Sequence, residues 1–213
     1  MTLPASQRVL IEGAAGPIET VLDLPPAVRG IALLCHPHPL FGGTLHNKVV
    51  QTLAKAMRDL GYAALRPNFR GVGESAGHHD HGIGESEDML RVIDYGRDRF
   101  GDLPVVLGGF SFGGYVQTRV ARRLTQADRP PQRIVLIGLA AGFVTGGRTY
   151  AAEAVPPDTL LIHGEQDDTV PLANVFDWAR PQELPVIVVP GADHFFHRRL
   201  HLIRDIVLNN WRP

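Results

Sequence analysis

A serine in a glycine-rich segment is the first side chain of this sequence that could do chemistry. Ser111 lies in GGFSFGG, residues 108–114, after the apolar run VVL and before YVQTRVARRL, which has helical character. A strand-to-helix turn of this kind holds a side chain clear of the sheet, and it requires residues without side chains at Gly109 and Gly113. The pattern indicates a nucleophilic serine. The alternative is a glycine-rich turn with an incidental serine, because GxSxG strings also occur by accident.

A nucleophilic serine needs a histidine base and a carboxylate that orients the base. Asp167 and Asp168 follow an apolar run in LLIHGEQDDTVP, and His194 follows the next run in VVPGADHFFHRR. Residues after the carboxyl ends of parallel strands converge at one edge of a sheet, so these positions can meet there. An acid after a strand is by itself usually a turn former, and a histidine beside phenylalanines is usually a packing residue. The joint occurrence of serine, acid and histidine carries the prediction.

Short apolar runs predict the strands that would position these residues. They cover residues 31–35, 62–65, 104–109, 133–138, 159–164 and 185–190. Because the runs are apolar nearly throughout, both faces of each strand should be covered, as in a parallel sheet between layers of helices.

Helical patterns lie between these runs at residues 49–61 and 85–100, and a third, at residues 197–211, follows the last run. The runs RVLIE (8–12) and IETVLDL (18–24) flank GAAGP and predict an antiparallel hairpin at one sheet edge. We therefore predict an α/β fold with a mostly parallel central sheet flanked by helices on both faces, in a single domain over residues 1–213.

The composition narrows the function classes. Lys+Arg and Asp+Glu number 21 and 22, which disfavours nucleic acid as a partner because no long basic run offsets this balance. No stretch of about 18 apolar residues is present, so a membrane-spanning helix is not expected. The lone Cys35 cannot form an internal disulfide and is expected to be a buried packing residue, and the N-terminus lacks the apolar stretch of a signal peptide. These features predict a cytoplasmic globular protein, and they leave its oligomeric state open.

Five motifs together resemble those of small, lidless bacterial α/β-hydrolases, a group of hydrolases and carboxylesterases related to dienelactone-hydrolase-like enzymes. The motifs are CHPHPLFGG, RPNFRGVGES, GGFSFGG, HGEQDDTVP and GADHFF, and the similarity covers roughly residues 8–211. The resemblance implies the α/β-hydrolase fold. It also implies that Asp167 in HGxxDxxVP is the catalytic acid, with Asp168 as the fallback, and that His194 in GxxHxF is the base. His197 and His201 are then expected at exposed positions of the last helix.

A tetrahedral oxyanion needs two hydrogen-bond donors. In this fold the residue after the nucleophile, here Phe112, supplies one from its backbone N–H. The other is expected in CHPHPLFGGT, where the two prolines have no N–H to offer. The remaining candidates are His36, His38, Leu40 and Phe41. Similarity of HPLFG to the HxxFG loop of dienelactone-hydrolase-like relatives implies Leu40, and it leaves His36 and His38 to orient the loop.

Two other motifs suggest different functions. GVGESAG, residues 71–77, contains a variant of the dinucleotide fingerprint, but it does not directly join a strand to a helix, and the hydrolase RGxGxS pattern accounts for the same residues. HHDH, residues 78–81, could bind a metal ion, but consecutive residues do not converge without special backbone geometry. We therefore expect HHDH to lie in a mobile, solvated loop.

The segment between the fourth and fifth of the six apolar runs is too short for a cap domain. Residues 143–158 leave room for a loop or a short helix, which predicts an open site that accepts small or surface-presented acyl groups. The expected function is hydrolysis of small carboxylic esters or thioesters through an acyl-enzyme on Ser111, with no metal or organic cofactor. The alternatives are a noncatalytic binding or regulatory protein of the same fold and a nucleotide-binding oxidoreductase.

Overall fold

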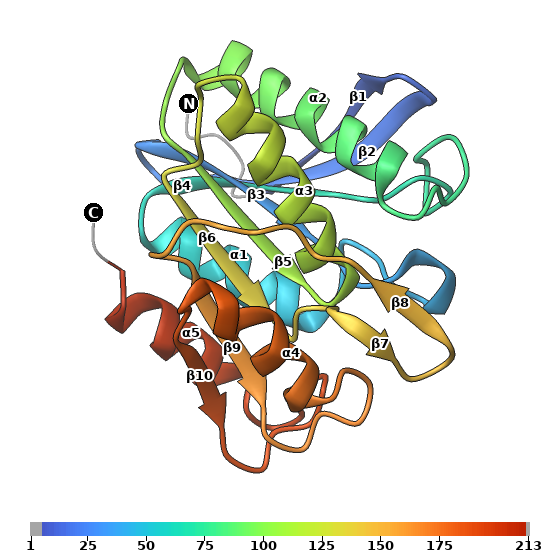
Figure 1. The fold of residues 1–213 in the computed structure, drawn as a ribbon. Coiled ribbons are helices and arrows are strands. Elements are labelled where there is room, and N and C mark those ends of the chain that lie inside the picture. Colours follow the sequence, from blue (N-terminus) through green and yellow to red (C-terminus); the bar gives the residue numbers. More distant parts are fainter. Residues whose placement is uncertain (1–5, 212–213) are drawn as a thin grey trace.

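A computed structural model describes residues 6–211 of the protein, which form one large sheet and a small hairpin (Figure 1). In the order in which they lie side by side, the eight strands of the large sheet are β1 (Ser6–Gly13), β2 (Gly16–Asp23), β4 (Tyr62–Pro67), β3 (Gly30–Cys35), β5 (Val105–Phe110), β6 (Arg133–Ile137), β9 (Leu160–Gly164) and β10 (Val186–Val189). All neighbours from β4 to β10 are parallel. The hairpin of β1 and β2 pairs antiparallel with β4 at one edge. The predicted mostly parallel sheet and its edge hairpin are confirmed.

Helices cover both faces of this sheet, as predicted. On one face lie α1 (Lys48–Asp59) and α5 (Leu200–Asn209), whose Leu53 and Ile203 share one apolar cluster with the strands. On the other lie α2 (Ile83–Phe100), α3 (Phe112–Gln126) and α4 (Leu172–Ala179), whose Met89, Val116 and Val175 belong to the second cluster. The two apolar faces explain why β3, β4 and β5 are buried at every residue. Within residues 6–211, no helix has both the length and the apolar character needed to cross a membrane.

The structure differs from the sequence-based expectation in three places. After β6 the chain forms an antiparallel hairpin of β7 (Gly142–Val144) and β8 (Arg148–Tyr150), where a loop or short helix was expected. The helix α4 was not predicted, because it is short and owes its order to the packing of buried Val175 and Ala179. The last helix begins at Leu200, three residues later than the helical pattern suggests.

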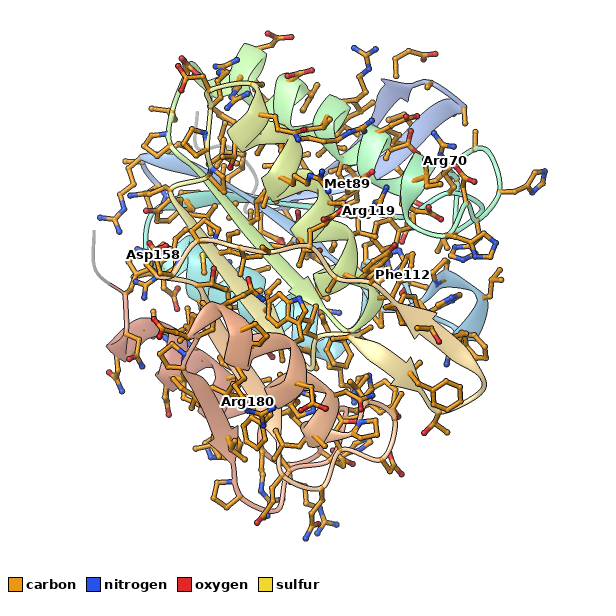
Figure 2. The ribbon with its side chains drawn as sticks, viewed as in Figure 1. Arg70, Met89, Phe112, Arg119, Asp158 and Arg180 are labelled. Atoms are coloured by element: carbon orange, nitrogen blue, oxygen red, sulfur yellow. The ribbon has the colours of Figure 1, made fainter. Side chains whose placement is uncertain are left out.

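The carboxyl ends of the parallel strands meet at one edge of the sheet, and the loops that follow them carry the candidate residues. Phe112, at the start of α3, lies toward this edge, whereas Asp158, which precedes β9, lies at the opposite end of the molecule (Figure 2). The hairpin of β7 and β8 projects beside the same edge (Figure 1). The fold therefore gathers residues from distant parts of the sequence around Ser111.

Candidate active site

Ser111 occupies a strained turn between β5 and α3. Its backbone has φ 55° and ψ −120°, a conformation that costs a residue with a side chain about 1–3 kcal/mol. A Cβ atom at Gly109 would overlap the carbonyl oxygen of Gly113, and a Cβ atom at Gly113 would overlap the carbonyl oxygen of Cys35. Both positions therefore require glycine. The predicted turn geometry around Ser111 is present, and the Ser111 N–H holds it by donating to the Ile137 carbonyl at 2.9 Å.

A continuous hydrogen-bonded path joins Ser111, His194 and Asp167. Nε2 of His194 lies 3.0 Å from Oγ of Ser111, and Nδ1 lies 2.7 Å from Oδ2 of Asp167. The other carboxylate oxygen accepts the N–H groups of Thr169 at 3.0 Å and Val170 at 2.7 Å. Donation of the Nδ1 proton to the carboxylate leaves Nε2 as an acceptor that faces the serine hydroxyl.

The structure also separates these residues from the alternatives in the sequence. Asp168 is exposed, and its carbonyl oxygen accepts the Thr145 hydroxyl at 2.7 Å. His197 is exposed and pairs with Asp193, and it precedes the last helix rather than lying within it. His201 is exposed on α5. Only Asp167, among the two neighbouring aspartates, contacts His194.

A histidine that sequence reasoning missed, His163, lies behind the carboxylate of Asp167. Its Nε2 is 2.9 Å from the carbonyl oxygen of Val170 and 3.3 Å from Oδ2 of Asp167, so one N–H can reach both acceptors. Burial lowers the pKa of His163, although the nearby Asp167 charge opposes that shift. Its place in LLIHG, four residues before Asp167, was the available signal. His163 holds the carboxylate oxygen that faces His194.

His36 anchors the loop that follows β3. Its Nδ1 lies 2.6 Å from the carbonyl oxygen of Pro37, and its Nε2 accepts the Phe69 N–H at 2.9 Å. The neutral ring satisfies both contacts, since one nitrogen donates and the other accepts. Burial lowers the pKa of His36 to about 3. The expectation that His36 orients this loop agrees with these contacts.

The depressed pKa of His36 predicts a loss of stability in mild acid. Between the ordinary pKa of 6.5 and the folded value of about 3, the unfolded chain binds one more proton at this site, so stability falls as pH falls. From pH 6.5 to pH 5 the contribution is about 2 kcal/mol. In urea unfolding at pH 7 and pH 5, His36→Gln should lose about 2 kcal/mol less than the parent. The exposed His46→Gln should behave like the parent, and equal losses for all three proteins would contradict this role for His36.

The N–H of Leu40, the expected second oxyanion donor, is engaged within the loop that follows β3. The N–H of Leu40, in the short 3-10 helix η1 (Pro39–Phe41), donates to Nδ1 of His38 at 3.2 Å, and its side chain is exposed. The N–H groups of Phe41 and Gly43 donate to the carbonyl oxygen of His38, each at 3.1 Å. Among the described residues, the N–H of His38 itself has no acceptor. The same holds for the N–H of Phe112 in the first turn of α3.

Comparisons with known proteins identify the family of this chain. The family described as serine aminopeptidase, S33, matches residues 26–151, which is more than half of the chain. The chain belongs to this family. A crystal structure from Xanthomonas campestris, described as an α/β serine hydrolase without lid, is 36% identical and covers 99% of this chain and 95% of that one, with a TM-score of 0.85.

Two curated relatives of this S33 family member share shorter segments. An uncharacterised protein of Rickettsia prowazekii is 30% identical over 174 residues, which are 78% of this chain and 71% of that protein. The lysophosphatidylserine lipase ABHD12 of Gallus gallus is 37% identical over 84 residues, and this match spans only 22% of the lipase. The resemblance to small lidless bacterial α/β-hydrolases and the predicted α/β-hydrolase fold are confirmed, and the chain is a hydrolase of that class.

Ser111 and His194 of this S33 family member open into a cavity of about 390 Å³. The cavity is lined by Pro37, His38, Phe41, Gly42, Gly43, Asn47, Ser111, Thr145, Gly146, Arg148, Thr169, His194 and Phe195. Leu40 is not among these residues, whereas His38 is. A larger hollow of about 500 Å³ lies at the amino ends of β6 and β9, next to Arg133 and Thr159, and so at the wrong edge of the sheet to serve Ser111.

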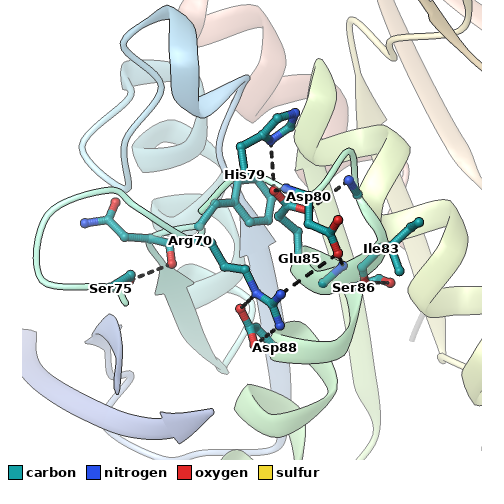
Figure 3. A network of polar contacts seen from close by, with 12 residues as sticks. Arg70, Ser75, His79, Asp80, Ile83, Glu85, Ser86 and Asp88 are labelled. Carbon is teal, nitrogen blue, oxygen red and sulfur yellow. Dashed lines mark hydrogen bonds and ion pairs between the residues drawn. The ribbon is translucent and has the colours of Figure 1, made fainter. Parts of the chain in front are cut away.

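The HHDH segment of this family member is a loop with His78 and His81 exposed, as predicted, but its second histidine is not solvated. The side chain of His79 is buried, and its Nδ1 lies 2.8 Å from a carboxylate oxygen of fully buried Glu85 (Figure 3). Glu85 also accepts the N–H groups of Asp80 at 2.9 Å and Gly82 at 2.8 Å, which caps the start of α2. Within residues 6–211, no three or more His, Cys, Asp or Glu side chains are grouped so that they could hold a metal ion.

Proposed function

We propose that this protein hydrolyses small carboxylic esters or thioesters through an acyl-enzyme on Ser111, with His194 as the base and Asp167 as the acid. The observation that carries this proposal is the hydrogen-bonded path from Asp167 through His194 to Ser111, at 2.7 and 3.0 Å, beside an open cavity. A path of this kind lowers the cost of removing the serine proton as the hydroxyl attacks.

The reaction proceeds in two steps. Oγ of Ser111 attacks the substrate carbonyl while Nε2 of His194 takes the hydroxyl proton, and His194 then returns that proton to the departing alcohol or thiol. Water, activated by the same nitrogen, attacks the acyl-enzyme and releases the carboxylic acid. Asp167 stabilises the histidine cation that forms in each step.

The N–H groups of Phe112 and His38 are the oxyanion donors in this proposal. His38 takes the place of Leu40, because the N–H of Leu40 is already bonded to the His38 ring and the N–H of His38 has no acceptor among the described residues. Both proposed donors lie close to Ser111. Phe112 is the next residue in the sequence, and His38 lines the same cavity as Ser111. Donors fixed before the reaction stabilise the developing charge without a cost of reorganisation.

The relatives support ester cleavage without naming a substrate for this chain. ABHD12 is named as a lysophosphatidylserine lipase, and lipases cleave carboxylic esters. After β6 the chain forms only the short hairpin of β7 and β8, where a cap domain could otherwise be inserted. A site without a cap favours small or surface-presented acyl groups. A cavity of about 390 Å³ is within the size range of small-ligand sites.

Labelling with a fluorophosphonate tests the proposal directly. The probe reacts with an activated serine, so the native protein should be labelled to about one equivalent, and peptide mapping should place the adduct on Ser111. Heat-denatured protein should remain unlabelled, because the path through His194 is lost. A folded protein that resists the probe but binds a ligand would support the noncatalytic alternative. Tight NAD binding without labelling would support the oxidoreductase alternative.

A further inference from the structure

One positively charged side chain, Arg148, lines the same cavity as Ser111 and His194. Arg148 lies on β8, in the hairpin that follows β6, and this hairpin reaches the active edge of the sheet (Figure 1). None of the residues that line the cavity is an aspartate or a glutamate. The guanidinium therefore faces a site that supplies no negative charge of its own.

The contacts of Arg148 hold its guanidinium in place without neutralising it. Its Cζ lies 4.0 Å from the centre of the Phe41 ring, and its Nη2 donates to the carbonyl oxygen of Thr145 at 2.9 Å. Its buried Nε has no hydrogen-bond partner, and the side chain forms no ion pair with a carboxylate within residues 6–211. A ring face and a carbonyl oxygen attract a guanidinium but carry no net charge. The arrangement leaves donors for a planar oxyanion such as a carboxylate.

The start of α3 adds positive potential to the cavity, and the His38 ring adds no charge. The first turn of α3 presents its N–H groups beside Ser111, and a helix N-terminus carries a partial positive charge. The ring of His38, which also lines the cavity, stays neutral because burial, and then the charges of His79, Arg148 and His81, lower its pKa to about 4. A ligand in this cavity thus meets positive potential from Arg148 and from the start of α3, while the Asp167 carboxylate lies behind His194 and does not line the cavity.

We propose that Arg148 selects substrates that carry a carboxylate or phosphate group in addition to the ester that Ser111 cleaves. This inference rests on the proposed function, since it assigns the substrate class of the same site. A substrate with an anionic group also differs from that of an aminopeptidase, the activity in the family description, because an aminopeptidase must bind the α-ammonium group of a peptide. Arg148 would repel that group, and no carboxylate that lines the cavity would attract it.

Matched pairs of esters test the proposal. On the acyl side the pair is mono-p-nitrophenyl adipate, which carries a free carboxylate, and p-nitrophenyl hexanoate, which is neutral and of similar length. On the alcohol side the pair is a butyryl glycerol phosphate and butyryl glycerol. The parent should prefer the anionic member of at least one pair, and the pair that shows the preference identifies the anion and the side on which it lies.

Substitution of Arg148 should remove this preference. Arg148→Gln is expected to lower kcat/KM for the preferred anionic ester about 10-fold, mainly through KM, because one charge-assisted pair is lost. The neutral ester should change less than 2-fold, and the rate of fluorophosphonate labelling at Ser111 should be unchanged. Arg148→Lys should retain part of the preference, because it keeps the charge but not the planar fork. Arg91→Gln, which changes an exposed arginine on α2, should match the parent.

The remaining results would overturn either the role of Arg148 or the proposed function itself. A parent that prefers the anionic ester of neither pair, or an Arg148→Gln variant that loses the same factor on charged and neutral esters, would overturn the role of Arg148. Either result would leave the proposed function intact as long as Ser111 is labelled. A parent that is neither labelled nor active on any of the four esters would overturn the proposed function itself.

Discussion

Replacement of Ser111 by alanine is expected to lower kcat for ester hydrolysis about 10⁶-fold and to abolish fluorophosphonate labelling. The reason is that Oγ of Ser111 lies 3.0 Å from Nε2 of His194, and within residues 6–211 no other hydroxyl bonds to that nitrogen. The residual rate should come from the oxyanion donors and from substrate binding alone. The loss should appear in kcat rather than KM, because the cavity that holds the substrate is unchanged.

A matched serine provides the control for this variant. Ser86 lies on α2, where its hydroxyl donates to the Ile83 carbonyl at 2.7 Å, away from the cavity. Ser86→Ala should retain the parental kcat and full labelling. Thermal unfolding should show that Ser111→Ala is folded, since alanine removes one oxygen and creates no overlap. A folded Ser111→Ala variant that keeps more than a hundredth of the parental kcat would contradict the assignment of the nucleophile.

The fold and the meeting of Ser111, Asp167 and His194 could be predicted because they depend on strong local patterns. Strands buried on both faces must be apolar throughout, and β3, β4 and β5 read that way in the sequence. Glycines around Ser111 are required by backbone contacts that no side chain can relieve. Parallel strands bring the ends of β5, β9 and β10 to one edge, so their following loops converge whatever the details of those loops.

Features that depend on the path of a single loop could not be predicted in this way. The direction of the Leu40 N–H is one such feature, because it depends on the local turn, and here the His38 ring accepts this N–H. The burial of His79 could not be predicted from the HHDH segment, because it depends on the position of Glu85 in the first turn of α2. The position of Arg148 could not be predicted from the sequence, because only the pairing of β7 with β8 brings this residue to the cavity.

Replacement of Asp167 by asparagine is expected to lower kcat about 10⁴-fold while it leaves the fold intact. The carboxylate accepts Nδ1–H of His194 at 2.7 Å and so keeps Nε2 free to accept the Ser111 proton. An amide can instead donate to Nδ1, which favours the tautomer that carries its proton on Nε2 and opposes proton transfer from serine. The neighbouring Asp168→Asn is the control: this side chain is exposed and does not contact His194, so kcat should change less than 2-fold. A larger loss for Asp168→Asn would assign the acid to Asp168, and comparable losses would contradict a role specific to Asp167; steady-state rates on a p-nitrophenyl ester distinguish these results.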